Sequence, residues 1–267
     1  MRTAYATFIR NWIVTRRAYP WSFFFGALLS GLITVALAYF TYHALASGQL
    51  GPGFTVHAGT SDYMSYIILG ASMYLLSVRV FLGVSRSLIT ERREGTFFSL
   101  LLTPTRRSAY FVGVAAQWIA ISMGEMAILL LITWPLGLNL SHIQLLTFVL
   151  VVPVAILGLF GMSILLGAIM LVSGDTYIVQ NTLFIAMALL CGFSFPPDYL
   201  PLPLQWLSAT LPVTGTLHLL RAALLQGGSP QAVLRDLGLY TILGVIYTIS
   251  GFWLMQKAER QVLEGTA

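Results

Sequence analysis

Side chains that could carry acid–base or metal chemistry are few in this chain, and their spacing matches no known site. The four histidines fall outside the centres of the apolar stretches, and no two of them have ligand spacing on one predicted helix. They are His43, His57, His142 and His218. The chain contains no Gly-x-Ser-x-Gly motif that would present a nucleophilic serine. The sequence therefore predicts neither a metal site nor a serine hydrolase.

Glu125 stands out because it lies deep within a long apolar stretch. A carboxylate at the centre of a membrane helix costs roughly 2.5–3.5 kcal/mol, so it should face other helices or a water-filled path. Two interpretations remain open. Glu125 lines a substrate route or binds a cation, or it is protonated or hydrogen-bonded to a neighbouring helix. Arg79 lies near the end of its apolar stretch, and we expect it to extend toward the membrane surface.

The composition is that of a membrane protein. Apolar and aromatic residues make up 57% of the 267 residues and charged residues only 9%, whereas a soluble domain carries roughly 25% charged residues. The net charge of +5 does not indicate nucleic-acid binding, because the basic residues cluster at the ends of apolar stretches, where lipid headgroups lie. The single cysteine, Cys191, excludes an intrachain disulfide. We predict an all-α polytopic membrane protein that contacts lipids and no nucleic acid.

Six apolar stretches are long enough to cross a bilayer, which takes about 20 helical residues. They are Trp21–Tyr42, Tyr63–Val84, Tyr110–Trp134, Leu145–Val172, Tyr177–Phe195 and Leu237–Met255. We expect the first to be a retained span, because it is longer than the apolar core of a signal peptide. The sequence therefore predicts six transmembrane helices.

A seventh apolar stretch, between residues 200 and 220, is broken too often to be one spanning helix. It contains Pro201, Pro203 and Pro212. We predict that residues 196–228 form an extracellular re-entrant or interfacial hairpin, with Gln205–Leu211 and Gly215–Leu225 as its arms. Such a hairpin persists at membrane depth only when it packs against protein or lines water.

The basic residues predict the orientation of the spans. Of the 14 lysines and arginines, 12 lie before the first predicted span, around the loop after the second, or after the last. These are Arg2, Arg10, Arg16, Arg17, Arg79, Arg86, Arg92, Arg93, Arg106, Arg107, Lys257 and Arg260, whereas Arg221 and Arg235 lie elsewhere. By the positive-inside rule, both termini and the second loop are cytoplasmic and the protein is a multi-pass protein of the cell membrane.

Residues 1–19 predict an amphipathic helix before the first span. Tyr5, Phe8, Ile9, Trp12 and Ile13 recur at the spacing of one helical face. Such a helix lies in the cytosolic membrane interface. It serves either as an anchor for the first span or as a functional gate.

The loop at residues 85–105 is charged in its first half and apolar in its second. Thr103 and Pro104 are suited to begin the next helix as its cap and first residue. Phe97 and Phe98 add apolar bulk between the charged residues and this cap. The loop is either a connector at the lipid surface or a segment that docks into a protein groove.

The same loop resembles the cytosolic loop of type-2 ABC exporter permeases. The resemblance rests on Glu91-Arg92-x-x-Gly95-Thr96-x-x-x-Leu100-Leu101-x-x-Pro104 and extends over essentially the whole chain. The Pro-rich segment from Phe195-Pro196-Pro197 through Leu211-Pro212 to Leu220-Arg221-x-x-Leu224-Leu225-x-Gly227 fits the same family, as do the amphipathic start and the count of six spans.

The resemblance implies a single transmembrane permease domain over residues 1–267, working as a dimer with a second permease copy. In that family the loop holds a coupling helix that docks on a separate ABC ATPase, which implies two ATPase copies per dimer. Glu91, Arg92, Glu94 and Gly95 would lie at that contact. The implied cargo is amphipathic, lipid-linked or drug-like and moves outward.

The sequence independently indicates that this chain has no ATP-binding P-loop. Such a loop needs Gly-Lys-Ser/Thr, and the only lysine, Lys257, lies between Gln256 and Ala258. The chain is thus expected to carry no cofactor and not to be an enzyme, with ATP and Mg²⁺ bound by the partner ATPase. Two alternatives remain: an intramembrane enzyme that uses Glu125 with a histidine, and a non-transporting scaffold or sensor subunit.

Overall fold

The computed structural model describes residues 2–18, 21–45, 52–96, 99, 102, 106–173 and 176–264. Helices joined by turns and short loops make up these ranges, which contain no strand. The all-α prediction is therefore confirmed for this part of the chain. Phe97, Phe98, Thr103 and Pro104, which the sequence singled out in the second loop, lie outside the described residues.

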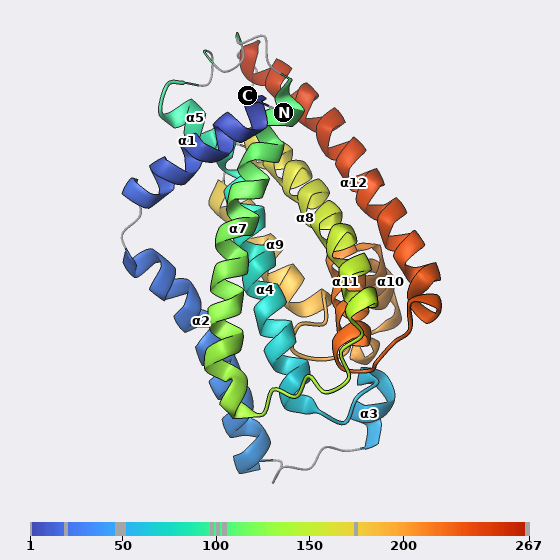
Figure 1. Ribbon diagram of the computed structural model, residues 1–267. Helices are drawn as coiled ribbons and strands as arrows, with labels where there is room; N and C mark the ends of the chain where they lie inside the picture. Colours follow the sequence, from blue (N-terminus) through green and yellow to red (C-terminus); the bar gives the residue numbers. More distant parts are fainter. Residues whose placement is uncertain are drawn as a thin grey trace.

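Five helices are long and apolar enough to cross a membrane. They are α2 (Trp21–Phe40, continued by the π-helix η1, Thr41–Leu45), α4 (Tyr63–Ser85), α7 (Arg107–Thr133, followed by the 3₁₀ turn η2, Trp134–Leu136), α8 (Leu145–Ser173) and α12 (Pro230–Leu263). In Figure 1 they run side by side along the long dimension of the molecule. Pro153 lies within α8 without ending it.

The predicted fifth span is wrong at its C-terminal end. Helix α9 covers Thr176–Leu190, not Tyr177–Phe195. Its 15 residues extend about 22 Å, less than the ~30 Å of a bilayer core. Gly192 has a positive φ of 73° and Pro196 follows, so the chain leaves the helix where the sequence remains apolar. Among the described residues, five helices rather than six therefore have spanning length.

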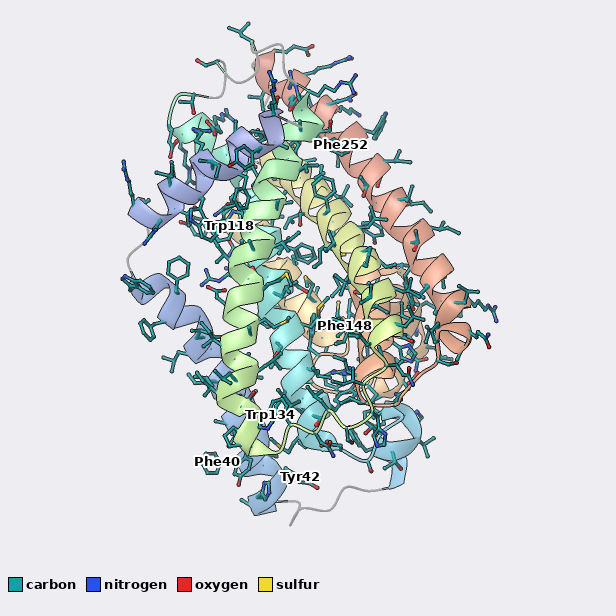
Figure 2. The ribbon with its side chains drawn as sticks, viewed as in Figure 1. Phe40, Tyr42, Trp118, Trp134, Phe148 and Phe252 are labelled. Atoms are coloured by element: carbon teal, nitrogen blue, oxygen red, sulfur yellow. The ribbon has the colours of Figure 1, made fainter. Side chains whose placement is uncertain are left out.

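Helix α4 lies at the centre of the bundle, and α2 lies at its edge. About 78% of the apolar window of α4 is buried, compared with 12% for α2. The main core joins Val80 and Phe81 of α4 to Phe111 of α7 and Ile164 of α8. The exposed apolar faces of α2 and α12 suit lipid contact. Figure 2 shows Phe40, Tyr42 and Trp134 at one end of the bundle, as expected of aromatic residues at a membrane interface.

Helices α8 and α12 approach closely because glycines face each other. A Cβ added to Gly161 would lie 2.7 Å from the Thr248 amide nitrogen, and one added to Gly251 would lie 3.0 Å from that of Leu165. Small residues commonly permit such close backbone contact between membrane helices. The packing of α12 on α8 therefore depends on the absence of side chains at these positions.

The predicted outer hairpin corresponds to two helices whose bounds differ slightly from the predicted arms. They are α10 (Leu202–Thr210) and α11 (Pro212–Leu224), preceded by the 3₁₀ turn η3 (Pro197–Tyr199). Pro201 and Leu211 provide the extended residues before each helix. Most of α11 is buried, and Val213 and Leu217 join the main core. The hairpin thus packs against protein, as its backbone requires at membrane depth.

Three shorter helices complete the described fold: α1 (Arg2–Ala18), α3 (Pro52–Ala58) and α5 (Ser87–Arg93). Helix α1 lies against α7 through Ala4 and Thr7, next to Gly113. Its predicted apolar stripe, including Tyr5, Ile9 and Ile13, is exposed. Figure 1 places both chain ends at the same end of the bundle as α5.

The glycine contact predicts that Gly161→Val destabilises the protein by ~1–3 kcal/mol, because the added methyl groups cannot fit against Thr248. Gly238→Val is the matched control, since Gly238 lies in α12 with open space around its Cα. Thermal unfolding in detergent should show a clearly lower Tm for the first variant only. Equal losses in the two variants would mean that helix propensity, not packing, is responsible.

Candidate functional site

The short helix α5 is mounted directly on the end of α4. Only Arg86 separates the two helices, and its backbone is itself α-helical, with φ −81° and ψ −11°. Its amide donates to the Leu82 carbonyl, and the Thr90 amide donates to the Arg86 carbonyl. Helix α5 therefore follows the central helix of the bundle with almost no break in the helical backbone.

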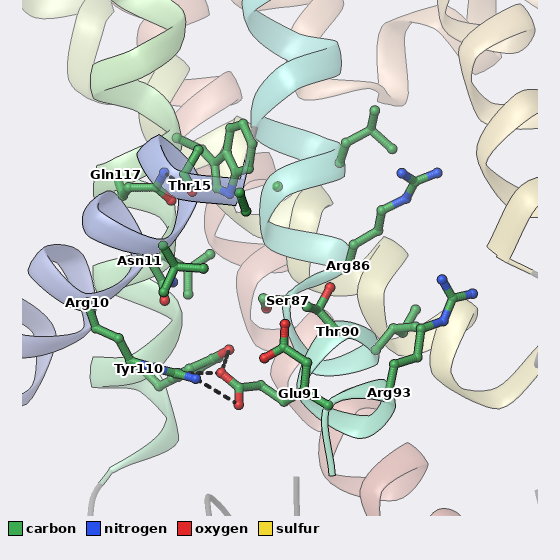
Figure 3. A pocket seen from close by; sticks show the side chains of 18 of the residues that line it. Arg10, Asn11, Thr15, Arg86, Ser87, Thr90, Glu91, Arg93, Tyr110 and Gln117 are labelled. Carbon is green, nitrogen blue, oxygen red and sulfur yellow. Dashed lines mark hydrogen bonds and ion pairs between the residues drawn. The ribbon is translucent and has the colours of Figure 1, made fainter. Parts of the chain in front are cut away.

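Glu91 joins α5 to two other helices through one carboxylate. The residue is only 5% exposed. Both terminal nitrogens of Arg10 in α1 donate to it, with Nη2 at 3.3 Å from Oε2, and Tyr110 Oη of α7 lies 3.4 Å from Oε1. The Thr96 hydroxyl also donates to Oε2. Figure 3 shows the contacts from Arg10 and Tyr110 meeting at the Glu91 carboxylate.

The surroundings of Glu91 keep it ionised. Burial by itself raises the pKa of this carboxyl, but the hydrogen bonds from Arg10 and Thr96 outweigh burial, and its pKa lies below the ordinary value. The same pair raises the pKa of Arg10, chiefly through the hydrogen bond to Glu91. The stabilisation that the Arg10–Glu91 contact gives the folded protein is thus fully present when the pH is above the ordinary glutamate pKa. It is lost only as the pH falls through the lowered pKa of Glu91.

The other predicted loop residues lie on the outside of the same turn. Arg92, Glu94 and Gly95 are exposed, as is Arg93 beside them. Gly95 has a φ of +74°, a conformation that glycine adopts without strain. It lets the chain turn back so that the Thr96 amide donates to the Glu91 carbonyl at 2.9 Å while its hydroxyl reaches the Glu91 carboxylate. The structure thus separates the predicted set: Glu91 is buried, and the other three are exposed.

Arg79 and Glu125 form a buried ion pair between α4 and α7. Arg79 Nε and Nη2 each lie 3.0 Å from a different oxygen of Glu125. The prediction that Arg79 extends to the membrane surface is therefore wrong, since the residue is 7% exposed and paired within the bundle. Of the two interpretations of Glu125, this geometry favours a bond to a neighbouring helix. Its partner is an arginine, not the histidine that an intramembrane enzyme would have needed.

Further polar contacts brace the helices at the α5 end. Arg107, at the start of α7, pairs with Glu259 near the end of α12. Gln117 of α7 donates to the Thr15 hydroxyl of α1 at 3.1 Å. Sequence reasoning missed these pairs because their members lie 152 and 102 residues apart. Within the described residues no three His, Cys, Asp or Glu side chains gather as a metal site.

Comparison with known proteins supplies the family. A family model described as ABC-2 type transporter matches residues 4–225, which is most of the chain. The chain belongs to the ABC-2 type transporter family. A comparison with curated protein sequences found no match.

Membership makes this chain a multi-pass membrane protein and a transport permease that is not itself catalytic. Permeases of this family generally work with an ATPase subunit. The matched region includes all but the first two residues of α1, and it includes α5, the Arg79–Glu125 pair and the α10–α11 hairpin.

At the opposite end of this ABC-2 permease, Arg221 fixes the hairpin to the bundle. Its guanidinium donates to the carbonyls of Gly192, Tyr66 and Phe193 at 2.8–3.1 Å and lies over the Tyr66 ring at 3.3 Å. Arg221 thus joins α11, α4 and the segment after α9. Sequence reasoning placed Arg221 on the outer side without a role, although an arginine among apolar residues of a Pro-bounded helix was a usable signal.

The buried pair predicts that Glu125→Gln destabilises the permease by ~3–5 kcal/mol, because Arg79 loses its carboxylate within the bundle. The exposed Glu264→Gln is the matched control. The double variant Arg79→Glu, Glu125→Arg restores an ion pair with its charges exchanged. Its Tm should therefore fall by less than the summed losses of the two single variants. Losses that simply add in the double variant would contradict a pairwise interaction.

The Arg221 contact predicts that Arg221→Lys loosens the hairpin, because an ammonium group cannot hold three carbonyls and stack on Tyr66. Backbone amides of residues 196–225 should exchange hydrogen at least about tenfold faster, equivalent to ~1.4 kcal/mol, while those of α8 stay protected. Arg235→Lys, at an exposed position, serves as control. Unchanged exchange in the hairpin would refute this role.

Proposed function

We propose that this permease is the transmembrane subunit of an ATP-driven exporter. A separate ABC ATPase would supply the energy and bind ATP and Mg²⁺, and the permease would move an amphipathic, lipid-linked or drug-like cargo outward. The observation that carries the proposal is the two-sided character of α5. Its inner side is tied to α1 and α7 through Glu91, and its outer side presents Arg92 and Glu94.

This arrangement suits a docking element for a motor. Arg92 and Glu94 offer charges of both signs to a partner surface, and such charges set register and specificity at an interface. A push on the exposed side would pass through Glu91 to Arg10 and through Arg86 to α4. Because α4 carries both Arg79 and the carbonyl that Arg221 holds, the push would reach the hairpin at the other end.

The proposed orientation places α5 and both termini in the cytoplasm of the cell. It is supported by the basic residues, 11 of 14 of which belong to segments assigned to that side once Arg79, which lies inside the bundle, is set aside. Both chain ends lie with α5 in Figure 1, which requires an even number of crossings. We propose six, with α9 and the segment after it making the crossing that α9 alone is too short to complete.

Helix α1 would then lie in the cytosolic interface. Its exposed Ile9, Trp12 and Ile13 would enter the lipid, while Thr7 and Thr15 face the bundle. A second permease copy would complete the path for cargo, and two ATPase subunits would dock on the two α5 helices. The α10–α11 hairpin would then lie on the extracellular side, near the exit.

Charge reversal on the outer side of α5 tests the proposal. Arg92→Glu combined with Glu94→Arg should reduce co-purification of the ATPase and its stimulation by the permease at least about tenfold, since like charges now oppose the partner. Arg235→Glu, an exposed reversal at the other end of the bundle, should leave both unchanged. Thermal unfolding of all variants should match the unmodified protein.

Either of two results would contradict the proposal. If the double reversal left the coupled ATPase activity intact, α5 would not be the docking element. If the purified permease alone carried out its activity with no nucleotide-hydrolysing partner, it would not be a subunit of an ATP-driven exporter.

A further inference from the structure

A polar cavity of about 360 Å³ opens between α1, α4, α5 and α7. Its polar lining includes Asn11 and Thr15 of α1, Gln117 of α7 and Thr90 of α5, and Figure 3 shows these side chains around the hollow. The cavity lies at the α5 end of the bundle, where the basic residues gather. It is therefore positioned at the level of lipid headgroups.

The described lining of this cavity carries an excess of positive charge. Four arginines and two glutamates contribute to it. They are Arg10, Arg79, Arg86, Arg93, Glu91 and Glu94. Glu91 is already bonded to Arg10, and Arg79 to Glu125. Arg86 and Arg93 then remain against Glu94, and Arg86 also donates to Gln180. The resulting net charge of +1 favours an anionic ligand, such as a phosphate group.

Gln117 gives a second, independent indication of a ligand. The residue is fully buried, and while its Nε2 donates to Thr15, its Oε1 has no partner. Turning the amide over would leave its nitrogen unpaired instead, so the need for a partner does not depend on the assignment. Buried polar atoms are nearly always satisfied. A ligand with a hydroxyl or ammonium group would donate the hydrogen bond that Gln117 Oε1 lacks.

An apolar groove of about 380 Å³ adjoins the cavity, and the two share Arg79 and Leu82 in their walls. The groove lies between α2, α4 and α9, and Arg79 is the one charged residue in its described lining. From Leu82 to Ala71 on α4 the groove extends about 16 Å, a length that accommodates much of an acyl chain. A polar hollow and an apolar one thus meet end to end along α4.

We propose that the two hollows bind one anionic phospholipid of the bilayer leaflet on the α5 side. The phosphate lies near Arg93 and its neighbours, a headgroup hydroxyl donates to Gln117, and one acyl chain follows α4 through the groove. The bound lipid fills the space between α1 and α4 and supports the position of α5. This site goes beyond the proposed exporter function, because its occupancy requires neither ATPase nor cargo.

Native mass spectrometry of the purified full-length permease tests the site. The protein is equilibrated with equal amounts of phosphatidylglycerol, phosphatidylethanolamine and phosphatidylcholine of the same chains. One phosphatidylglycerol per chain should be retained, with a preference over phosphatidylcholine of about tenfold. Equal retention of the three lipids would mean a nonspecific annulus and would overturn the proposal.

Three variants with matched controls separate the contributions. Gln117→Leu removes the hydrogen-bond acceptor, Arg93→Gln removes a positive charge, and Val78→Trp fills the apolar groove. Each should lower phosphatidylglycerol retention about fivefold or more. The matched controls change residues outside both hollows and should leave phosphatidylglycerol retention unchanged. They are Gln231→Leu, Arg92→Gln and Val245→Trp. Arg93→Gln alters an exposed side chain, so it keeps the test valid if a buried variant misfolds.

Retention unchanged by all three variants would overturn the site. Because lipid retention is measured without the ATPase, that result would leave the exporter proposal standing. Conversely, specific lipid binding by a permease that fails to couple to an ATPase would leave the lipid site standing.

Discussion

The Glu91 carboxylate is the point at which the short helix α5 is joined to both α1 and α7. Without it, α5 would still follow α4 through Arg86 and pack on the core through Leu88, but it would lose its polar contact with α1. With it, α1 and α7 are fixed to the same few atoms. A docking element is mechanically useful only when its far side is held in this way, so the proposed transport mechanism depends on this contact.

The bilayer explains why the two buried arginines Arg79 and Arg221 are each held by more than one hydrogen bond. A charge inside a membrane protein is tolerated when it is paired or held by backbone groups. Arg79 meets a carboxylate in two-point geometry, and Arg221 meets three carbonyls and an aromatic ring. Both contacts involve α4, the most enclosed helix of the bundle. Helix α4 therefore connects the α5 end to the hairpin end through fixed contacts rather than through apolar packing alone.

Sequence reasoning succeeded where local length and composition determine the structure. The long apolar stretches became α2, α4, α7, α8 and α12, and the prolines divided the hairpin near the predicted points. It failed where tertiary partners decide. Helix α9 ends at Leu190 because Gly192 turns the chain within an apolar run, which hydropathy does not register.

The same limit applies to the site. The spacing of Glu91, Arg92, Glu94 and Gly95 indicated the loop but not that Glu91 points inward, because its partner Arg10 lies 81 residues away. Glu125 was identified as unusual, but Arg79, 46 residues away, was assigned to the membrane surface instead of to Glu125. A single sequence contains no signal that pairs such distant residues.

Side-specific labelling tests the central claim, that the exposed face of α5 is a cytoplasmic docking element for an ATPase. Cys191 is the only cysteine, so Arg92→Cys in a Cys191→Ala background provides one reactive thiol on that face. A membrane-impermeant maleimide should label it only in inside-out vesicles, and saturating ATPase should slow the labelling. Labelling in right-side-out vesicles, or an unchanged rate with bound ATPase, would contradict the account.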